Sequence, residues 1–185
     1  MSEELFVKYC SPTLAGIKTG SLFSAKYSSE EELDRFIRDI NERLIKKGLR
    51  VVPLKKDGGI ALIYAYRPSK LRFDLGEKQA REILEESGYE SLDPDALLSA
   101  LKRRINGGGD FPHEIGLFLG YPPEDVKGFI DNKAKNFKRS GIWKVYGDEK
   151  RSDALFSKYR KCADVYLKKY REGNTLERLT VFSAT

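Results

Sequence analysis

The feature that most constrains the fold is an amphipathic helix that carries its own start and stop signals. Ser29 and Glu32 form a capping box at its beginning. Apolar residues then recur at intervals of three and four positions until Gly48: Leu33, Phe36, Ile37, Ile40 and Leu44. The pattern predicts a helix that begins after Ser29, ends before Gly48 and buries one face.

Two strand candidates follow this helix directly, at residues 49–54 and 60–66. Asp57-Gly58 between them is a strong signal for a tight hairpin turn. The second strand, IALIYAY, is apolar on both faces, which is typical of a central strand covered on two sides. With a short strand expected at residues 4–9, the segment is interpreted as a β-α-β-β unit.

Beyond Pro68 the pattern becomes mainly helical. A helix is expected at about 77–87, and another at 94–105 opens with Asp93 as its cap and Pro94 at its first position. The other expected elements are helices near 112–119 and 123–136, the strand IWKVY at 142–146, a long helix near 150–171 and an edge strand in the tail TLERLTVFS.

These elements predict an α+β protein. Its small, mainly antiparallel sheet would combine the N-terminal β-α-β-β unit with the IWKVY strand, and several helices would pack on it. At 185 residues the chain is expected to form a single domain. The run Asn-Gly-Gly-Gly at 106–109 is the candidate boundary, and it would separate an α/β part at 1–106 from a helical part at 110–185.

The composition is that of a globular protein, with 40% hydrophobic and 34% charged residues. No apolar run approaches the roughly 20 residues that cross a bilayer, and the N-terminus lacks the order of a signal peptide. We therefore expect a cytoplasmic protein without membrane insertion. Its two cysteines, Cys10 and Cys162, lie far apart and are expected to be free thiols.

The formal net charge of +6 is unevenly distributed. Residues 111–185 hold 15 Lys and Arg against 10 Asp and Glu, so they carry +5 of it. A basic C-terminal part favours an anionic partner such as nucleic acid. Charged helix faces exposed to water would produce the same excess.

The segment CSPTLAGIKTGS at 10–21 is the first candidate functional region. It is predicted to be a turn-rich loop, whose glycines would let backbone amides approach a ligand closely. Lys18 would supply the charge of an anion site, and Thr19 and Ser21 would line it. The spacing is not that of a phosphate-binding Walker A loop, and an ordinary connection between two elements is the competing interpretation.

The second region is FPHEIGLFLGYPPEDVKGFI at 111–130, which holds the single histidine. His113 is suited to proton transfer near neutral pH, and Glu114 follows it. Cys10 becomes a candidate nucleophile if the fold places His113 or Lys18 beside it. Cys10, His113 and Glu114 are also candidate ligands of a metal or cofactor, although HEIGL is not the HExxH motif of zinc enzymes. A histidine that only makes local contacts at a helix start is the alternative.

The same segment has the spacing of a helix-turn-helix corner, with Gly116, Gly120 and Val126 at the critical positions. Two acids, Glu124 and Asp125, would however face the DNA backbone at the start of the second helix. A purely structural helical hairpin is the competing interpretation. If the corner binds nucleic acid, the cations expected to contact it are Lys127, Lys133, Lys135, Lys138 and Arg139.

Four motifs resemble those of a known family: CSPTLAGIKTGSLF, YRPSKL, FPHEIGLFLGYPPEDVKGFI and GIWKVYGD. Over nearly its full length the chain is similar to an uncharacterised family from anaerobic Gram-positive bacteria, which is classed as a domain of unknown function. The resemblance implies no activity.

The residues therefore favour a ligand, anion or metal-cofactor site between the 10–21 loop and the helix start at 111–116. The alternative is a nucleic-acid-binding or regulatory module that uses the helix-turn-helix-like corner at 112–136. The residues point to no particular cofactor, and they leave open whether the protein is an enzyme. The folded positions of Cys10, Lys18 and His113 discriminate between these hypotheses.

Overall fold

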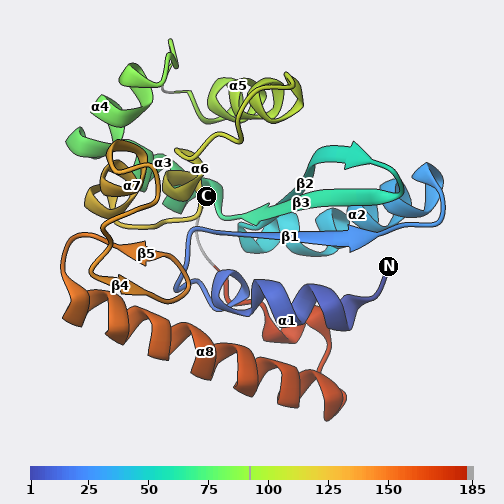
Figure 1. Cartoon of the computed structure of the whole chain (residues 1–185). Helices are drawn as coiled ribbons and strands as arrows, with labels where there is room; N and C mark the ends of the chain where they lie inside the picture. The colour runs from blue at the N-terminus through green and yellow to red at the C-terminus, as the bar shows by residue number, and fades with distance from the viewer. Residues whose placement is uncertain (92, 183–185) are drawn as a thin grey trace. The chain divides into compact units, whose positions relative to one another are not determined.

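The computed structural model describes residues 1–91 and 93–182, and the chain divides into two compact units (Figure 1). The first unit contains Met1–Lys70 and Lys161–Thr185, and the second contains Leu71–Arg160. Helix α8 (Glu149–Arg171) continues without a break through the second of these boundaries. The fold class is α+β, as predicted.

The first unit is built on a three-stranded antiparallel sheet, β1 (Gly20–Lys26), β2 (Arg50–Asp57) and β3 (Ile60–Tyr66). The strand order is β1-β3-β2, so β3 is the central strand, as its two apolar faces predicted. The predicted hairpin turn is also confirmed, because Gly58 and Gly59 connect β2 to β3 with φ of 52° and 77°.

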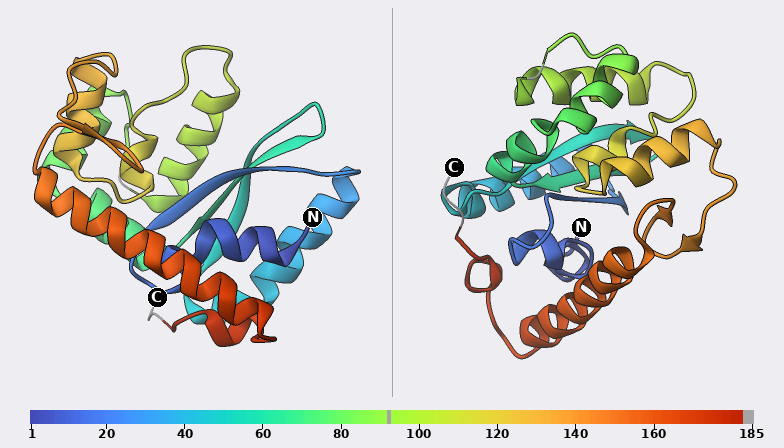
Figure 2. Two further views of the ribbon diagram at one scale, coloured as in Figure 1. Left: turned by 60° about the horizontal axis from the view of Figure 1, so that its bottom comes forward. Right: turned by 90° about the vertical axis from the view of Figure 1, so that its left-hand side faces the viewer.

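Helices α1 (Glu3–Leu14) and α2 (Glu30–Leu44) pack with the sheet into one core (Figure 2). The predicted cap of α2 is confirmed, since the Ser29 hydroxyl accepts a hydrogen bond from the Glu32 backbone N–H at 3.2 Å. The core side chains of this unit come from both helices, the three strands and the short α9 (Leu176–Leu179). They include Phe6, Cys10, Leu33, Ile40, Ile63 and Leu176.

The strand predicted at residues 4–9 is wrong, because these residues belong to α1. Ser2 caps the helix, with its hydroxyl accepting from the Leu5 N–H at 3.3 Å, and acids in the first turn favour a helix start. The buried residues Phe6, Val7, Cys10 and Leu14 are spaced three and four apart, which is a helical period. The first strand of the β-α-β-β unit is instead β1, which begins within the predicted loop.

Two further strand predictions are corrected. IWKVY does not join the three-stranded sheet: β5 (Lys144–Val145) pairs only with β4 (Arg139–Ser140) among the described residues. In the tail, the predicted edge strand is replaced by α9 and a segment without regular secondary structure through Phe182, while Ser183 lies outside the described residues.

Arg67 is fully buried in the first unit, next to the ends of two helices. Its guanidinium donates to the carbonyls of Thr13 at 2.6 Å, Leu14 at 2.7 Å, Val181 at 2.7 Å and Lys47 at 3.1 Å. Thr13 and Leu14 end α1, and Lys47 ends a short 3-10 helix after α2. The negative ends of two helix dipoles thus stabilise this charge in place of a carboxylate.

The second unit is mainly helical. It contains most of α3 (Pro68–Leu75), then α4 (Lys78–Glu86), α5 (Pro94–Asn106), α6 (Ile115–Phe118), α7 (Pro123–Asp131) and the first part of α8. The helices predicted at 77–87, 94–105 and 150–171 are confirmed, and Asp93 caps α5. The run at 106–109 lies inside this unit, after α5.

Two helices of this unit are shorter than predicted and one was not predicted. Helix α6 has a single turn, and α7 ends at Asp131 rather than near 136. Its end is followed by three non-glycine residues with left-handed backbones, Lys133, Ala134 and Asn136, which cannot continue a right-handed helix. Helix α3 was missed because its apolar periodicity is weak.

A candidate ligand cavity in the second unit

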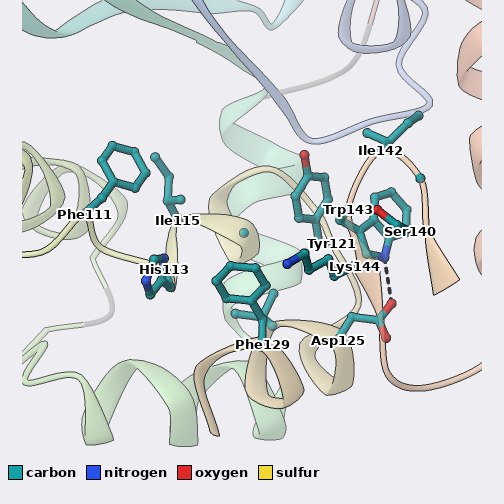
Figure 3. Close-up of a pocket in the computed structure, with 13 residues that line it drawn as sticks. Phe111, His113, Ile115, Tyr121, Asp125, Phe129, Ser140, Ile142, Trp143 and Lys144 are labelled. Carbon is teal, nitrogen blue, oxygen red and sulfur yellow. Dashed lines mark hydrogen bonds between the residues drawn. The ribbon is translucent and has the colours of Figure 1, made fainter. Parts of the chain in front are cut away.

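The second unit contains a cavity of about 400 Å³ whose lining comes from two segments, 111–129 and 140–144 (Figure 3). Aromatic and apolar side chains form most of it: Phe111, Ile115, Tyr121, Val126, Phe129, Ile142 and Trp143. The polar side chains that line it are those of His113, Asp125, Ser140 and Lys144. Phe111, Ser140 and Ile142 are exposed, so the cavity opens to solvent on their side.

Asp125 fixes one wall of the cavity by joining α7 to the segment after it. Its buried carboxylate accepts from the Trp143 indole N–H at 2.7 Å and from the backbone N–H groups of Tyr146 and Gly147 at 2.7 Å each. The Ser152 hydroxyl adds a longer contact of 3.4 Å. Both carboxylate oxygens are therefore occupied, and these hydrogen bonds stabilise the carboxylate in its buried position.

The glycines of the motifs FPHEIGLFLGYPPEDVKGFI and GIWKVYGD allow other side chains to approach the backbone closely. A Cβ on Gly116 would lie 2.8 Å from Val126 Cγ2, and a Cβ on Gly128 or Gly141 would overlap the rings of Tyr146 and Phe156 respectively. A Cβ on Gly147 would likewise overlap the Glu124 side chain. The spacing of these glycines is thus explained by close packing.

Two aromatic contacts hold the cavity wall in place. The Tyr121 and Trp143 rings stack with centroids 4.6 Å apart, and the Trp143 and Phe156 rings meet edge to face at 4.4 Å. Burial raises the pKa of Tyr121 to about 12, so its hydroxyl keeps its proton at neutral pH.

Lys144 and His113 both contact aromatic rings of the cavity. The Lys144 ammonium donates to the Ala134 carbonyl at 2.7 Å and lies 4.7 Å and 5.7 Å from the ring centroids of Phe137 and Phe129. Within the described part of the chain it has no carboxylate within 4.0 Å. His113 is exposed and meets the Phe129 ring edge to face at 4.9 Å.

The predicted pairing of residues 10–21 with 111–116 involves two different units. Cys10, Lys18, Thr19 and Ser21 belong to the first, whereas His113 belongs to the second. Each set is therefore described within its own unit.

In the first unit, the predicted loop is largely a helix end and a strand. Cys10 lies within α1 and is fully buried, and burial raises the pKa of its thiol far above the ordinary value. A thiol in this state packs in the core, in an environment that disfavours the thiolate form. Lys18 is 8% exposed, and burial lowers its pKa to about 8 although the nearby Cys10 raises it.

Thr19 and Ser21 are also buried rather than presented on a loop. The Ser21 hydroxyl lies 2.9 Å from the Thr13 hydroxyl. The Thr19 carbonyl accepts a hydrogen bond from the backbone N–H of Arg67 at 2.9 Å. Both residues thus join β1 to neighbouring segments of the first unit.

Glu114 makes structural contacts within the second unit. Its carboxylate is buried, with one oxygen 2.8 Å from the Arg104 guanidinium and 3.0 Å from the Tyr89 hydroxyl that donates to it. The pKa of Tyr89 is raised well above its ordinary range, first by burial and then by this carboxylate. Glu114 therefore connects the helix start at 115 with α5, and it does not line the cavity.

The cations predicted for nucleic acid fall into two groups. Lys127 pairs with Glu86 at 2.6 Å, Arg139 pairs with Asp153 at 2.6 Å, and Lys138 donates to the Gly147 carbonyl at 2.9 Å. Lys133 and Lys135 are exposed. In the first turn of α7, the Asp125 carboxylate is held by the backbone N–H groups of residues 146 and 147, whereas Pro123 and Glu124 are half-buried.

In ranges 1–91 and 93–182, no group of three or more His, Cys, Asp or Glu side chains is arranged to hold a metal ion. Over the same ranges, no helix combines the length and apolar character needed to cross a membrane.

The cavity residues that sequence reasoning missed are Lys144, Tyr121 and Phe129. A signal existed, because all three lie in the motifs FPHEIGLFLGYPPEDVKGFI and GIWKVYGD, but nothing in the sequence shows that these motifs meet. Trp143, which belongs to the predicted strand IWKVY, also lines the cavity and is 8% exposed.

The fold and the cavity define an α+β protein with an aromatic pocket in its helical unit. Comparison with family models assigns the chain more closely: residues 6–180 match the family described as "Protein of unknown function (DUF3793)", and the chain belongs to this family. Neither the curated proteins nor the solved structures gave a match.

Proposed function

We propose that the protein binds a small organic molecule in the cavity of its second unit. The observation that carries this proposal is the meeting of the only histidine and the only tryptophan of the chain at one open, largely aromatic cavity. A volume of about 400 Å³ is within the range of small-molecule pockets, which typically combine apolar walls with a few polar groups.

The arrangement supports binding more than catalysis. Asp125 is fully engaged by its donors, Glu114 lies outside the lining, and Cys10 belongs to the core of the other unit. Among the described residues, none is hydrogen-bonded to the His113 side chain, so no acid, base or nucleophile is paired with it as in a catalytic set.

The test uses 2-naphthol, a neutral planar probe that fits the volume, and isothermal calorimetry. We expect saturable 1:1 binding with a Kd on the order of 100 µM, from ordinary ligand efficiencies for about eleven heavy atoms. Phe129→Ala, which removes a lining ring, should weaken binding at least about fivefold.

Phe73→Ala is the matched control, because Phe73 is 73% exposed in the same unit and does not line the cavity. It should bind the probe as the wild type does. Equal weakening in both variants, or no saturable binding by the wild type, would refute the proposal.

A further inference from the structure

We infer that the occupant of this cavity is a planar organic anion, with its ring against the aromatic wall and its negative group at Lys144. This inference rests on the proposed function and adds the chemical class of the ligand. It depends on three observations: the shape of the wall, the state of the charges and the conformation of the loop that holds Lys144.

The wall favours a flat, apolar ring. Trp143 and Tyr121 form a stacked pair on one part of the lining, and Phe129 and His113 form an edge-to-face pair on another. Aromatic faces gain most from a second planar system, which can stack on them or meet them edge on. In Figure 3 the labelled rings come from both lining segments, so a ring bound there would contact both.

The charges favour an anion. An ammonium group has three donors, and Lys144 uses one on the Ala134 carbonyl. Other cations of this unit, Lys127 and Arg139, already pair with carboxylates. The carboxylate that does line the cavity, Asp125, has both oxygens occupied by donors. Lys144 is therefore the charged group of this cavity that still has hydrogen-bonding capacity for a ligand, and its charge is positive.

The loop at 133–136 holds Lys144 in place at a conformational cost. Lys133, Ala134 and Asn136 have φ of 48°, 61° and 57°, a region that costs residues other than glycine on the order of 1 kcal/mol each. This conformation presents the Ala134 carbonyl to the Lys144 ammonium, while Phe137 lies beside the same group. The strained loop thus fixes the position of the charge that the ligand would meet.

The experiment compares three probes that share a ring and differ in charge: 2-naphthoate, 2-naphthamide and 2-naphthylmethylammonium. Because the chain has a single Trp and a single His, the Trp143 indole N–H and the His113 imidazole each give one identifiable NMR signal from the cavity. We expect 2-naphthoate to shift both signals saturably and to bind at least about tenfold more tightly than 2-naphthamide.

Two lysine variants locate the charge effect. Lys144→Met should reduce the preference for the carboxylate over the amide to less than about threefold, and Lys144→Arg should retain most of it. Lys138→Met removes an exposed positive charge that does not line the cavity, and it should leave the preference unchanged.

Each alternative outcome has a distinct meaning. Equal binding of carboxylate and amide, tighter binding of the ammonium probe, or a preference that survives Lys144→Met would overturn the anion inference and leave the ligand cavity standing. Failure of all three probes and of 2-naphthol to bind would remove the proposed function as well.

Discussion

Asp125 is the residue whose loss should most disturb the second unit, because four donors meet on its buried carboxylate. Asp125→Asn keeps the shape of the side chain but turns one acceptor into a donor that faces other donors. We expect the free energy of unfolding to fall by about 3 kcal/mol. Urea denaturation followed by Trp143 fluorescence measures this loss.

Glu124→Gln is the neighbouring control. Glu124 faces the exposed Arg151 at 3.6 Å, a surface pair that should contribute less than about 1 kcal/mol. If the two variants lose equal stability, Asp125 does not have the role assigned to it.

Lys18 gives the first unit a distinct dependence of stability on pH. Burial lowers its pKa in the folded protein to about 8, against an ordinary value of 10.5. Below pH 8 it is protonated in both states, and between about pH 8 and 10.5 the unfolded chain binds the extra proton. The stability contributed at this site therefore rises with pH over that window, by about 3 kcal/mol at about 1.4 kcal/mol for each pH unit.

Cys10 acts in the opposite direction above pH 9, because its pKa is raised on folding. Comparison with Lys18→Met at each pH removes this shared contribution. We expect the wild type to gain stability relative to Lys18→Met as urea denaturation is repeated from pH 7 to pH 10. Lys26→Met, at an exposed position, controls for the loss of a positive charge, and parallel curves for wild type and Lys18→Met would contradict the account.

At the scale of elements, the contact between α7 and the β5 region depends on a glycine. A methyl group at Gly128 would lie 2.5 Å from Tyr146 Cβ and closer still to Tyr146 Cγ, and these atoms are so close to the backbone that a side-chain rotation cannot clear them. Gly128→Ala should lower the free energy of unfolding by about 1–3 kcal/mol despite the better helix propensity of alanine.

Gly109→Ala is the matched control, since nothing lies within 4 Å of a Cβ there and its backbone is not left-handed. It should change stability by less than about 0.5 kcal/mol. A Gly128→Ala protein that is as stable as the wild type would show that α7 is not packed against Tyr146 as described.

The elements that could be predicted are those whose signals lie within the segment itself. The capping box of α2, the Asp-Gly turn between β2 and β3, and Asp93-Pro94 at the start of α5 each specify a local conformation. Helix α1 was misread because ELFVKY suits a strand, and its helical period becomes clear only when Cys10 and Leu14 are included. The partner of β5 could not be found because β4 has only two residues.

The candidate site was only partly predictable. His113 was identified because it is the single histidine, and it does line a cavity. Lys144 was not identified, because its importance depends on the missing carboxylate partner and on the left-handed loop, which are tertiary properties. Lys18 was interpreted as an exposed loop cation, and the unexpected extent of α1 explains why it is buried.

At the scale of the whole molecule, α8 belongs to both units. Its first part contributes Phe156 and Tyr159 to the second unit, and its last part contributes Tyr166 and Tyr170, which pack on the core of the first. Breaking the helix at the boundary should therefore destabilise both units. Lys161→Pro should lower stability by at least about 3 kcal/mol, and Lys161→Ala, at the same exposed position, should not.

Each unit has its own probe for this prediction. Trp143 fluorescence reports on the second unit, and the reactivity of Cys10 toward a thiol reagent, in a Cys162→Ala background, reports on the first. Urea midpoints that fall together for both probes would support the shared role of α8. A change confined to one probe would show that the helix serves that unit alone.

The proposed ligand site lies between the segments 111–129 and 140–144 of the second unit. Intermolecular nuclear Overhauser effects between 2-naphthoate and the protein test it most directly, because they locate the probe. We expect effects from the naphthalene protons to the Trp143 and Phe129 rings, and the effect to Trp143 should weaken in Phe129→Ala. Effects only to exposed rings elsewhere, such as Tyr9 or Phe73, would contradict it.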